Sequence, residues 1–197
     1  MFSRGSQTRA DGIDDMNARN RLLEAFKARA FSFGDFTLAS GKKSSYYVNS
    51  KKAIFNGAVV NLLSEVLWEM TQDLNLDAAG GLEVGAIPMA AVLAQRYAMN
   101  GKALEGFFVR KQAKEHGAKE RVEGVLKAGM RVAVLDDVLT TGGSVLQAIA
   151  EIEKVGALVV AVVCIVDRLE GAGTALAKYP FRPIFTIRDF GVEPPVG

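Results

Sequence analysis

Apolar residues recur with helical spacing in several segments of this chain, and each stripe predicts an amphipathic helix. The first stripe begins at Asn17 and comprises Leu22, Leu23, Phe26 and Ala30. A longer one comprises Val59, Leu62, Leu63, Val66, Leu67, Met70 and Leu74. Pro88 suits the first turn of a helix that runs through Tyr97. A further helix is marked by Val145, Ala148, Ile149 and Ile152.

Continuous apolar runs alternate with these helices and predict strands over residues 79–84, 104–109, 131–135 and 158–166. Residues 184–187 are a candidate last strand, and residues 36–52 read as two short strands joined by a turn. Strands that are apolar on both faces indicate a mostly parallel sheet flanked by helices. The predicted fold class is therefore α/β, with a loose arm over residues 1–16 and one domain over residues 17–197. Residues 17–52 are expected to cap the site as a small hood.

The composition narrows the function classes. The 197 residues include 24 Lys and Arg against 22 Asp and Glu, and a net charge of +2 gives no general reason to bind nucleic acid. With one cysteine, Cys164, and one histidine, His116, a structural zinc site is not expected. The longest apolar run, residues 155–166, is too short for a membrane span of about 20 residues. The first residues carry no apolar signal segment, so we expect a cytoplasmic protein.

The strongest chemical signal is the segment VAVLDDVLTTGGSVLQAI, residues 132–149. Parallel sheets bind ligands at the carboxyl ends of their strands, and a buried strand here delivers Asp136 and Asp137 to that edge. A loop of small donors follows, namely Thr140, Thr141, Gly142, Gly143 and Ser144. Glycines let backbone N–H groups approach an oxyanion, and the start of a helix adds partial positive charge. The loop therefore predicts a phosphate cradle, although the lysine of the nucleotide P-loop is missing.

The two acids give the cradle its meaning. Carboxylates beside a phosphate site repel the phosphate unless they face hydroxyls or a cation, and vicinal sugar hydroxyls and Mg²⁺ both meet this condition. The segment thus indicates a phosphorylated sugar, with its phosphate in the loop and its hydroxyls on Asp136 and Asp137. Two alternatives stay open: an ordinary strand–turn–helix with solvated acids, and a phosphorylation-receiver pocket.

A second signal lies in VRKQAKEHGAKER, residues 109–121, which follow the end of a predicted strand. The segment concentrates basic side chains around Gly117, namely Arg110, Lys111, Lys114, His116, Lys119 and Arg121. Basic groups beside a glycine hinge suit a mobile lid that neutralises a polyanion such as diphosphate. The alternative is a solvated, charged hairpin or helix face.

Together these segments resemble the type I phosphoribosyltransferases and, within them, the orotate phosphoribosyltransferases. VLDDVLTTGGS resembles the phosphoribosyl diphosphate (PRPP) motif of the whole group, and RKQAKEHG resembles the catalytic loop of the orotate branch. FTLASGKKSSYYVNS resembles the N-terminal region that helps to hold the base, and GLEVGAIPMA resembles the loop beside the diphosphate. VDRLEG resembles the strand end whose arginine meets the orotate carboxylate. The similarity runs from Leu22 to Asp189.

The resemblance implies a type I phosphoribosyltransferase fold and transfer of ribose 5-phosphate from PRPP to N1 of orotate, in pyrimidine biosynthesis. It implies Mg²⁺ as a cofactor carried by PRPP, and a homodimer whose basic loop reaches the neighbouring site. The implied catalytic residues are Lys114, His116, Asp136 and Asp137. The implied PRPP-binding residues are Arg110, Lys111, Lys114, His116, Asp136, Asp137, Val138, Leu139, Thr140, Thr141, Gly142, Gly143 and Ser144. The implied orotate-binding residues are Thr140 and Arg168.

The chain departs from the family pattern at two positions. Ala39 and Gly85 stand where many members carry a lysine that contacts ligand. One of two neighbouring aromatic residues, Tyr46 or Tyr47, can stack on the base, and the alternative for it is plain core packing. Two other functions stay open: a phosphoribosyltransferase for adenine, hypoxanthine or uracil, and a non-catalytic PRPP sensor. The basic loop and Arg168 argue against the first, and a sensor needs no leaving-group loop.

Overall fold

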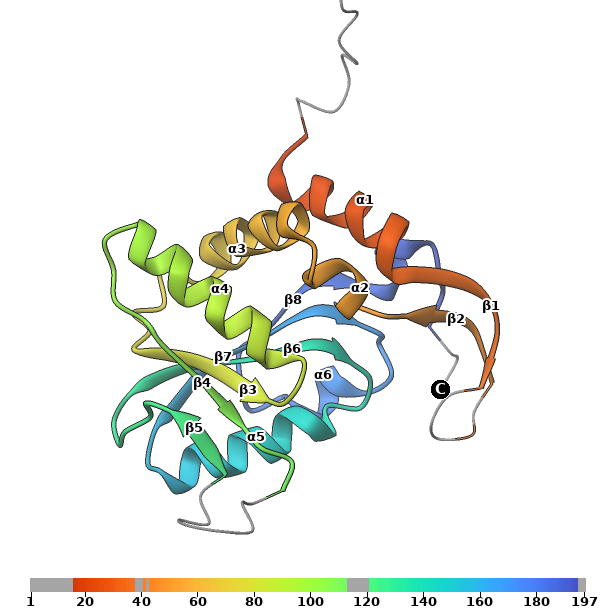
Figure 1. The fold of residues 1–197 in the computed structure, drawn as a ribbon. Coiled ribbons are helices and arrows are strands. Elements are labelled where there is room, and N and C mark those ends of the chain that lie inside the picture. Colours follow the sequence, from red (N-terminus) through yellow and green to blue (C-terminus); the bar gives the residue numbers. More distant parts are fainter. Residues whose placement is uncertain (1–15, 38–40, 42, 113–120, 195–197) are drawn as a thin grey trace, which may run out of the picture.

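The computed structural model describes residues 16–37, 41, 43–112 and 121–194. At the centre of these residues is a six-stranded sheet with the order β5-β4-β3-β6-β7-β8 (Figure 1). Its strands are β3 (Ala78–Leu82), β4 (Glu105–Val109), β5 (Val122–Gly124), β6 (Arg131–Leu139), β7 (Leu158–Asp167) and β8 (Phe181–Thr186). Neighbouring strands are parallel except for β5, which runs antiparallel to β4. The predicted α/β class with a mostly parallel sheet is confirmed.

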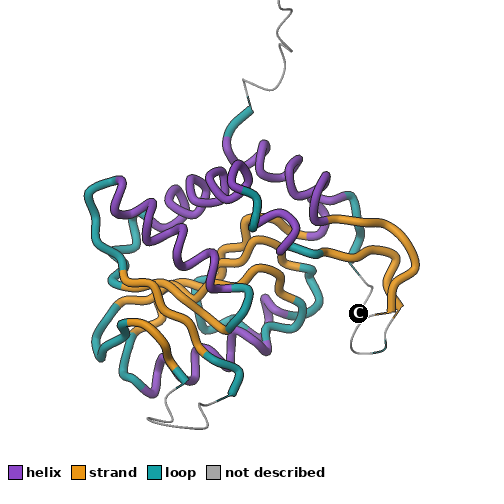
Figure 2. Tube along the Cα trace, viewed as in Figure 1, coloured by secondary structure: helices purple, strands orange, loops and turns teal. Residues whose placement is uncertain are grey.

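Helices cover both faces of this sheet (Figures 1 and 2). One face carries α1 (Ala18–Ala30), α3 (Gly57–Thr71) and α4 (Ala86–Met99), and the other carries α5 (Gly143–Lys154). Side chains of β6 alternate between the two layers. Ala133 and Leu135 pack with the α3 and α4 side, whereas Val132 and Val134 pack with the α5 side. Because both faces are buried, the strand reads as a continuous apolar run.

A small hairpin stands beside the sheet (Figure 1). β1 (Phe31–Thr37) pairs antiparallel with β2 (Lys43–Val48), and the short helix α2 (Lys51–Ile54) follows. The ring of Phe31 stacks on Tyr46 and on Phe190, with centroids 5.5 and 5.1 Å apart. Phe190 belongs to the last helical turn, η1 (Ile187–Phe190), so aromatic packing joins the hairpin to the end of the chain.

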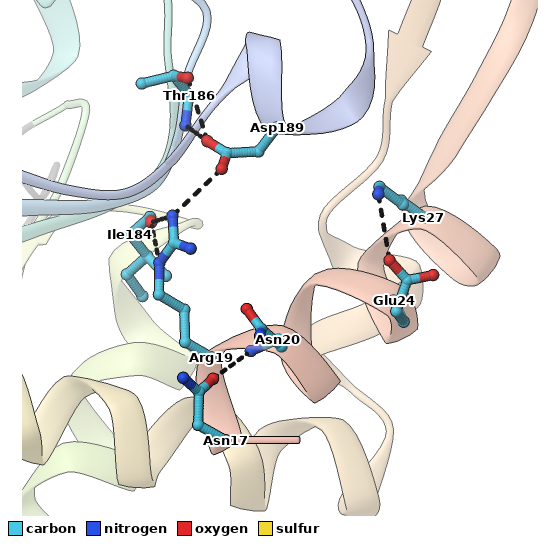
Figure 3. A network of polar contacts seen from close by, with 8 residues as sticks. All are labelled: Asn17, Arg19, Asn20, Glu24, Lys27, Ile184, Thr186 and Asp189. Atoms are coloured by element: carbon cyan, nitrogen blue, oxygen red, sulfur yellow. Dashed lines mark hydrogen bonds and ion pairs between the residues drawn. The ribbon is translucent and has the colours of Figure 1, made fainter. Parts of the chain in front are cut away.

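One arginine ties the first helix to the last elements (Figure 3). Arg19 donates to the carbonyl oxygen of Ile184 through Nε at 3.1 Å and Nη2 at 2.9 Å, and Nη2 lies 3.3 Å from the Asp189 carboxylate. Asp189 accepts from the backbone N–H and the hydroxyl of Thr186. Burial raises the pKa of Asp189, but these hydrogen bonds and Arg19 outweigh it and hold the pKa below 3.8.

Several element bounds differ from the sequence prediction. α3 ends at Thr71 rather than Leu74, and the last strand is Phe181–Thr186 rather than residues 184–187, because Ile187 begins η1. β1 begins at Phe31 rather than Phe36, and Val122–Gly124 forms an edge strand inside the expected charged break. β6 continues past Leu135 because its last residues pair with β7 as far as Leu139 with Asp167. The division into an arm and one domain stays a prediction, since residues 1–15 lie outside the described residues. Within the described part of the chain, no helix has the length and apolarity to cross a bilayer.

Candidate active site

The carboxyl ends of four neighbouring strands, β4, β3, β6 and β7, meet along one edge of the sheet. The segments that follow them are in direct contact: Glu83 N–H donates to the carbonyl of Val109 at 2.8 Å, and Arg168 N–H donates to that of Leu139 at 2.9 Å. The strand ends at which the sequence predicts chemistry therefore form one continuous edge. Asp136 and Asp137 both lie inside β6, which ends at Leu139, rather than after a strand that ends at Leu135.

The two acids of β6 are buried but have different partners. Asp136 and Asp137 are 7% and 6% exposed. Asp136 accepts a hydrogen bond from the Ser144 hydroxyl at 2.6 Å. Asp137 accepts from the Ser50 hydroxyl and from the Lys51 ammonium, whose nitrogen lies 2.6 Å away. One carboxylate is thus held by a hydroxyl and the other by a hydroxyl and a cation.

These partners separate the acidities of the two carboxyls. Burial raises the pKa of Asp136 to about 6, against a lowering by the Ser144 hydrogen bond, and the neighbouring charge of Asp137 adds to the rise. Burial acts on Asp137 too, but the hydrogen bonds from Lys51 and Ser50 outweigh it and hold its pKa below 3.8. Asp136 is therefore the more basic carboxylate, which suits it to accept a strong hydrogen bond from a ligand hydroxyl.

The loop after β6 presents backbone donors that lack acceptors. Gly142 has a φ of +84°, a left-handed conformation that suits glycine, and α5 begins at the next residue. No described residue accepts from the backbone N–H groups of residues 141–145. Thr141 and Gly143 are exposed, and Thr140 and Ser144 are half-buried. Free N–H groups at the start of a helix of 12 residues have the arrangement of an anion cradle.

Val138 and Leu139, which the sequence also predicts to bind PRPP, lie at the end of β6 and not in the loop. Leu139 is 1% exposed and its side chain packs in the core with α5, while Val138 packs against the opposite layer. Leu139 can therefore offer a ligand only backbone atoms, whereas the side chain of Val138 is half-buried.

Arg168, directly after β7, is held from two sides. Its Nε donates to the Tyr46 hydroxyl at 2.9 Å, and its guanidinium lies 4.8 Å from the centre of the Tyr46 ring. Its Nη2 pairs with Glu170 at 2.8 Å. Tyr46 is 5% exposed, whereas Tyr47 is 45% exposed and packs beside Phe36. The hairpin thus supplies the side chain that orients the strand-end arginine.

Only the base of the predicted basic loop is described, and Lys114, His116, Gly117 and Lys119 lie outside the described residues. Lys111 is exposed, and its backbone N–H donates to Glu83 at 2.8 Å. Arg121 donates to the carbonyls of Arg110 and Lys111 at 2.9 and 3.1 Å. The Arg110 guanidinium lies 3.6 Å from Glu123 of β5. Arg121 therefore anchors the base of the loop, and Glu83 joins that base to the end of β3.

Comparison with known proteins agrees with this geometry. The model of the phosphoribosyl transferase domain family matches residues 53–193. An orotate phosphoribosyltransferase of Bradyrhizobium sp. strain BTAi1 is 43% identical over 179 residues, which cover 88% of this chain and 97% of that protein. The chain belongs to the orotate phosphoribosyltransferase family. The family resemblance read from the sequence is thereby confirmed.

Solved structures of orotate phosphoribosyltransferases have the same fold. The Mycobacterium tuberculosis enzyme in complex with Fe(III) dicitrate aligns with a TM-score of 0.79 at 33% identity, covering 89% of this chain and 99% of that one. The same enzyme in complex with PRPP aligns with a TM-score of 0.75 at 30% identity, with the same coverage. The predicted fold of this orotate phosphoribosyltransferase is thus confirmed by structures as well as by sequence.

This member of the orotate phosphoribosyltransferases has two residues at the acids that the sequence pattern does not mark, Ser50 and Lys51. It also has a close approach at Gly85, where an added Cβ would lie 2.4 Å from Asp137 Oδ1 and 2.8 Å from Asp136 Oδ1. A side chain at this position of the loop between β3 and α4, such as the lysine that the family resemblance leads one to expect, would require the two carboxylates to shift. Ala39, the other departure, lies outside the described residues.

Proposed function

We propose that this protein transfers ribose 5-phosphate from PRPP to N1 of orotate, with orotidine 5′-phosphate and diphosphate as products. The observation that carries the proposal is the junction of β6 and α5, where two buried acids stand beside backbone N–H groups that have no acceptor among the described residues. A sugar phosphate offers hydroxyls to the acids and a phosphate to the N–H groups. PRPP is such a molecule, and it is bound in a solved structure of the Mycobacterium tuberculosis relative.

The reaction requires charge to be stabilised at two places, on the ribose ring and on the departing diphosphate. N1 of orotate, in its deprotonated anionic form, supplies the electron pair of the new C1–N1 bond while the bond from C1 to the diphosphate oxygen breaks and the diphosphate keeps that bond's electrons, so no protein nucleophile is needed. Asp136 and Asp137 accept hydrogen bonds from the ribose hydroxyls, and their negative charge favours a cationic ring. The N–H groups of residues 141–145, with the loop hydroxyls, hold the 5′-phosphate.

Arg168 gives the site its selectivity for orotate in this proposal. Orotate carries a carboxylate that uracil lacks, and a guanidinium binds carboxylates through paired, charge-assisted hydrogen bonds. Tyr46 orients the guanidinium through its hydroxyl and the face of its ring, and Glu170 pairs with Nη2 of Arg168. Thr140 is proposed to contact the base from the cradle loop.

Mg²⁺ fits this site as a partner of PRPP rather than as an ion held by the protein alone. Among the described residues, no three His, Cys, Asp or Glu side chains are grouped as a metal site. Mg²⁺ prefers one or two carboxylates together with waters and substrate phosphates. Asp136, which pairs with no described cation, and Asp137 are the residues that would hold it beside the ribose hydroxyls. When bound, the ion supplies Lewis-acid stabilisation of the diphosphate.

The basic loop completes the proposal. Arg110, Lys111, Lys114 and His116 are proposed to meet the diphosphate, with Lys114 or His116 as its proton donor. Closure of this loop excludes water, which would otherwise hydrolyse PRPP. We further propose a cytoplasmic homodimer in which the loop of one subunit serves the site of the other, on the basis of the family resemblance.

The test offers purified protein PRPP, Mg²⁺ and one base at a time: orotate, uracil, adenine or hypoxanthine. We expect diphosphate release with orotate alone. Asp137→Asn should abolish this release, while Asp35→Asn, in the exposed part of the hairpin, should not. Release with another base instead would assign a different transferase, and PRPP binding without turnover would make the protein a sensor.

A further inference from the structure

Lys51 places a positive charge beside the acid pair, and the proposed reaction assigns this lysine no role. Its ammonium nitrogen lies 2.6 Å from Asp137 Oδ2, and no other described Lys or Arg pairs with either acid. Arg168, after the next strand, is engaged with Glu170 at 2.8 Å. Lys51 is the first residue of α2, so the hairpin that precedes this helix carries the ammonium to the edge of the sheet.

The Lys51 ammonium has donors to spare. An ammonium group carries three N–H bonds, and Asp137 is its one acceptor among the described residues. The Lys51 side chain is 47% exposed, whereas that of Asp137 is 8% exposed. The ammonium group of Lys51 therefore contacts a buried carboxylate and at the same time remains accessible to a ligand from solvent.

The segment facing Lys51 across the acids cannot supply a second cation. A Cβ at Gly85 would lie 2.4 Å from Asp137 Oδ1, so a side chain at this point of the loop between β3 and α4 would have to displace the carboxylate. Positive charge beside Asp137 comes from the hairpin side alone among the described residues.

The position of Lys51 has a consequence that rests on the proposed function. PRPP carries its diphosphate on C1, and the adjacent carbon bears one of the hydroxyls that the acids would hold. A cation beside Asp137 is then one ribose carbon away from the leaving group. We propose that Lys51 binds the diphosphate of PRPP while it stays paired with Asp137, and so brings positive charge to the leaving group from the same chain that holds the ribose.

The test measures binding of Mg²⁺-diphosphate by calorimetry to the full-length protein and to two matched variants. Lys51→Gln keeps a donor for Asp137 but removes the charge. Lys52→Gln makes the same change on the next residue of α2, whose exposed side chain has no described partner. We expect the Kd for Mg²⁺-diphosphate to rise about 10-fold in Lys51→Gln, the size of one charge-assisted hydrogen bond, and to be unchanged in Lys52→Gln.

Three further readouts separate binding from a purely structural effect. The Kd for inorganic phosphate, which reports on the cradle, should be unchanged in Lys51→Gln. The KM for PRPP should rise while that for orotate does not. Lys51→Arg, which restores the charge, should recover most of the diphosphate affinity. If Lys51→Gln binds diphosphate as Lys52→Gln does, or loses phosphate affinity equally, Lys51 is not a diphosphate ligand.

Loss of folding in Lys51→Gln does not end the test, because the charge of Asp137 can be removed as well. Asp137→Asn and the double variant Asp137→Asn/Lys51→Gln both lack the buried charge, and the double variant should bind Mg²⁺-diphosphate about 10-fold more weakly than Asp137→Asn. Equal affinities would overturn the proposal. Failure of the wild-type protein to turn over orotate would instead overturn the proposed function, so the two failures are distinguishable.

Discussion

Asp136 and Asp137 demonstrate how one step along a strand changes what a carboxyl group does. Both are buried to a similar degree, but one is paired with a lysine and the other is not. Burial therefore dominates at Asp136 and raises its pKa to about 6, whereas the partners of Asp137 reverse the effect of burial. The acid pair thus combines one carboxyl whose pKa is lowered with a neighbour whose pKa is raised to about 6.

We expect Asp136→Asn to change stability in a pH-dependent way. Because folding raises the pKa of Asp136 from 3.8 to about 6, the folded chain binds more protons than the unfolded chain between these values. Stability from this group is therefore lost as the pH rises through about 6. Between pH 5 and pH 8 the wild-type protein should lose about 1 kcal/mol relative to the variant, as measured by urea unfolding. Asp35→Asn, at an exposed position, should follow the wild type, and a variant effect of equal size at both pH values would contradict the prediction.

Tyr46 is a positioning residue for Arg168, and Tyr46→Phe isolates its hydroxyl. The ring stays beneath the guanidinium, but Arg168 Nε loses the acceptor that now lies at 2.9 Å. We expect the KM for orotate to rise several-fold with little change in the KM for PRPP, and stability to fall by about 1 kcal/mol. Steady-state kinetics and urea unfolding check both values. Tyr47→Phe is the matched control on the same strand, and equal effects of the two changes would refute this role.

At the scale of elements, the loop between β3 and α4 packs closely against Asp136 and Asp137 at Gly85. Gly85→Ala places a methyl carbon where Asp137 Oδ1 is 2.4 Å away, so the loop or the carboxylates must shift. We expect the KM for PRPP to rise at least 10-fold, about 1.4 kcal/mol, because both acids lose their position. Gly57→Ala, at the start of α3, meets no atom within 4 Å and should leave the kinetics unchanged. Wild-type kinetics in Gly85→Ala would mean that the loop adapts without moving the acids.

Elements with a clear periodicity or a continuous apolar run could be predicted from the sequence, whereas short strands and strand ends that only pairing defines could not. The stripe from Val59 to Leu67 forms the buried face of α3, since the helix is long enough for its apolar spacing to repeat. β5 has three residues, too few for any period, and exists because it pairs with β4. The end of β6 could not be predicted from the sequence either. Asp136 interrupts the apolar run, but its backbone still pairs with Cys164 of β7.

The same distinction applies to the candidate site. Asp136, Asp137 and the cradle are neighbours in the chain, so their spacing alone indicated a sugar phosphate. Lys51 reaches Asp137 across a sequence separation of 86 residues, and only the docking of the hairpin brings the two together. No local pattern of residues contains that information, which is why a lysine at the acids could be identified only from the structure.

At the scale of the whole molecule, the site combines parts that are distant in the chain. The hairpin supplies Tyr46, and α2 directly after it supplies Lys51. The sheet and the segment after β7 supply the acids and Arg168, and the ring of Phe31 in the hairpin packs on Phe190 near the other end of the described chain. Arg19 of α1 adds to these contacts by binding the carbonyl of Ile184 in β8 (Figure 3). A site assembled in this way can also draw on a second subunit, as the proposed homodimer requires.

Mixing two inactive variants tests whether the basic loop serves a neighbouring subunit. Lys114→Ala removes the loop lysine, and Asp137→Asn removes an acid at the edge of the sheet. If the loop crosses to its partner, each mixed dimer keeps one site in which both residues are intact. Random exchange of subunits should then restore about a quarter of wild-type turnover, measured as diphosphate release after refolding the mixture. Asp136→Asn mixed with Asp137→Asn is the control that should stay inactive, because both changes lie on the same strand of one chain. Absence of recovery in the first mixture would mean that each site is complete within one subunit.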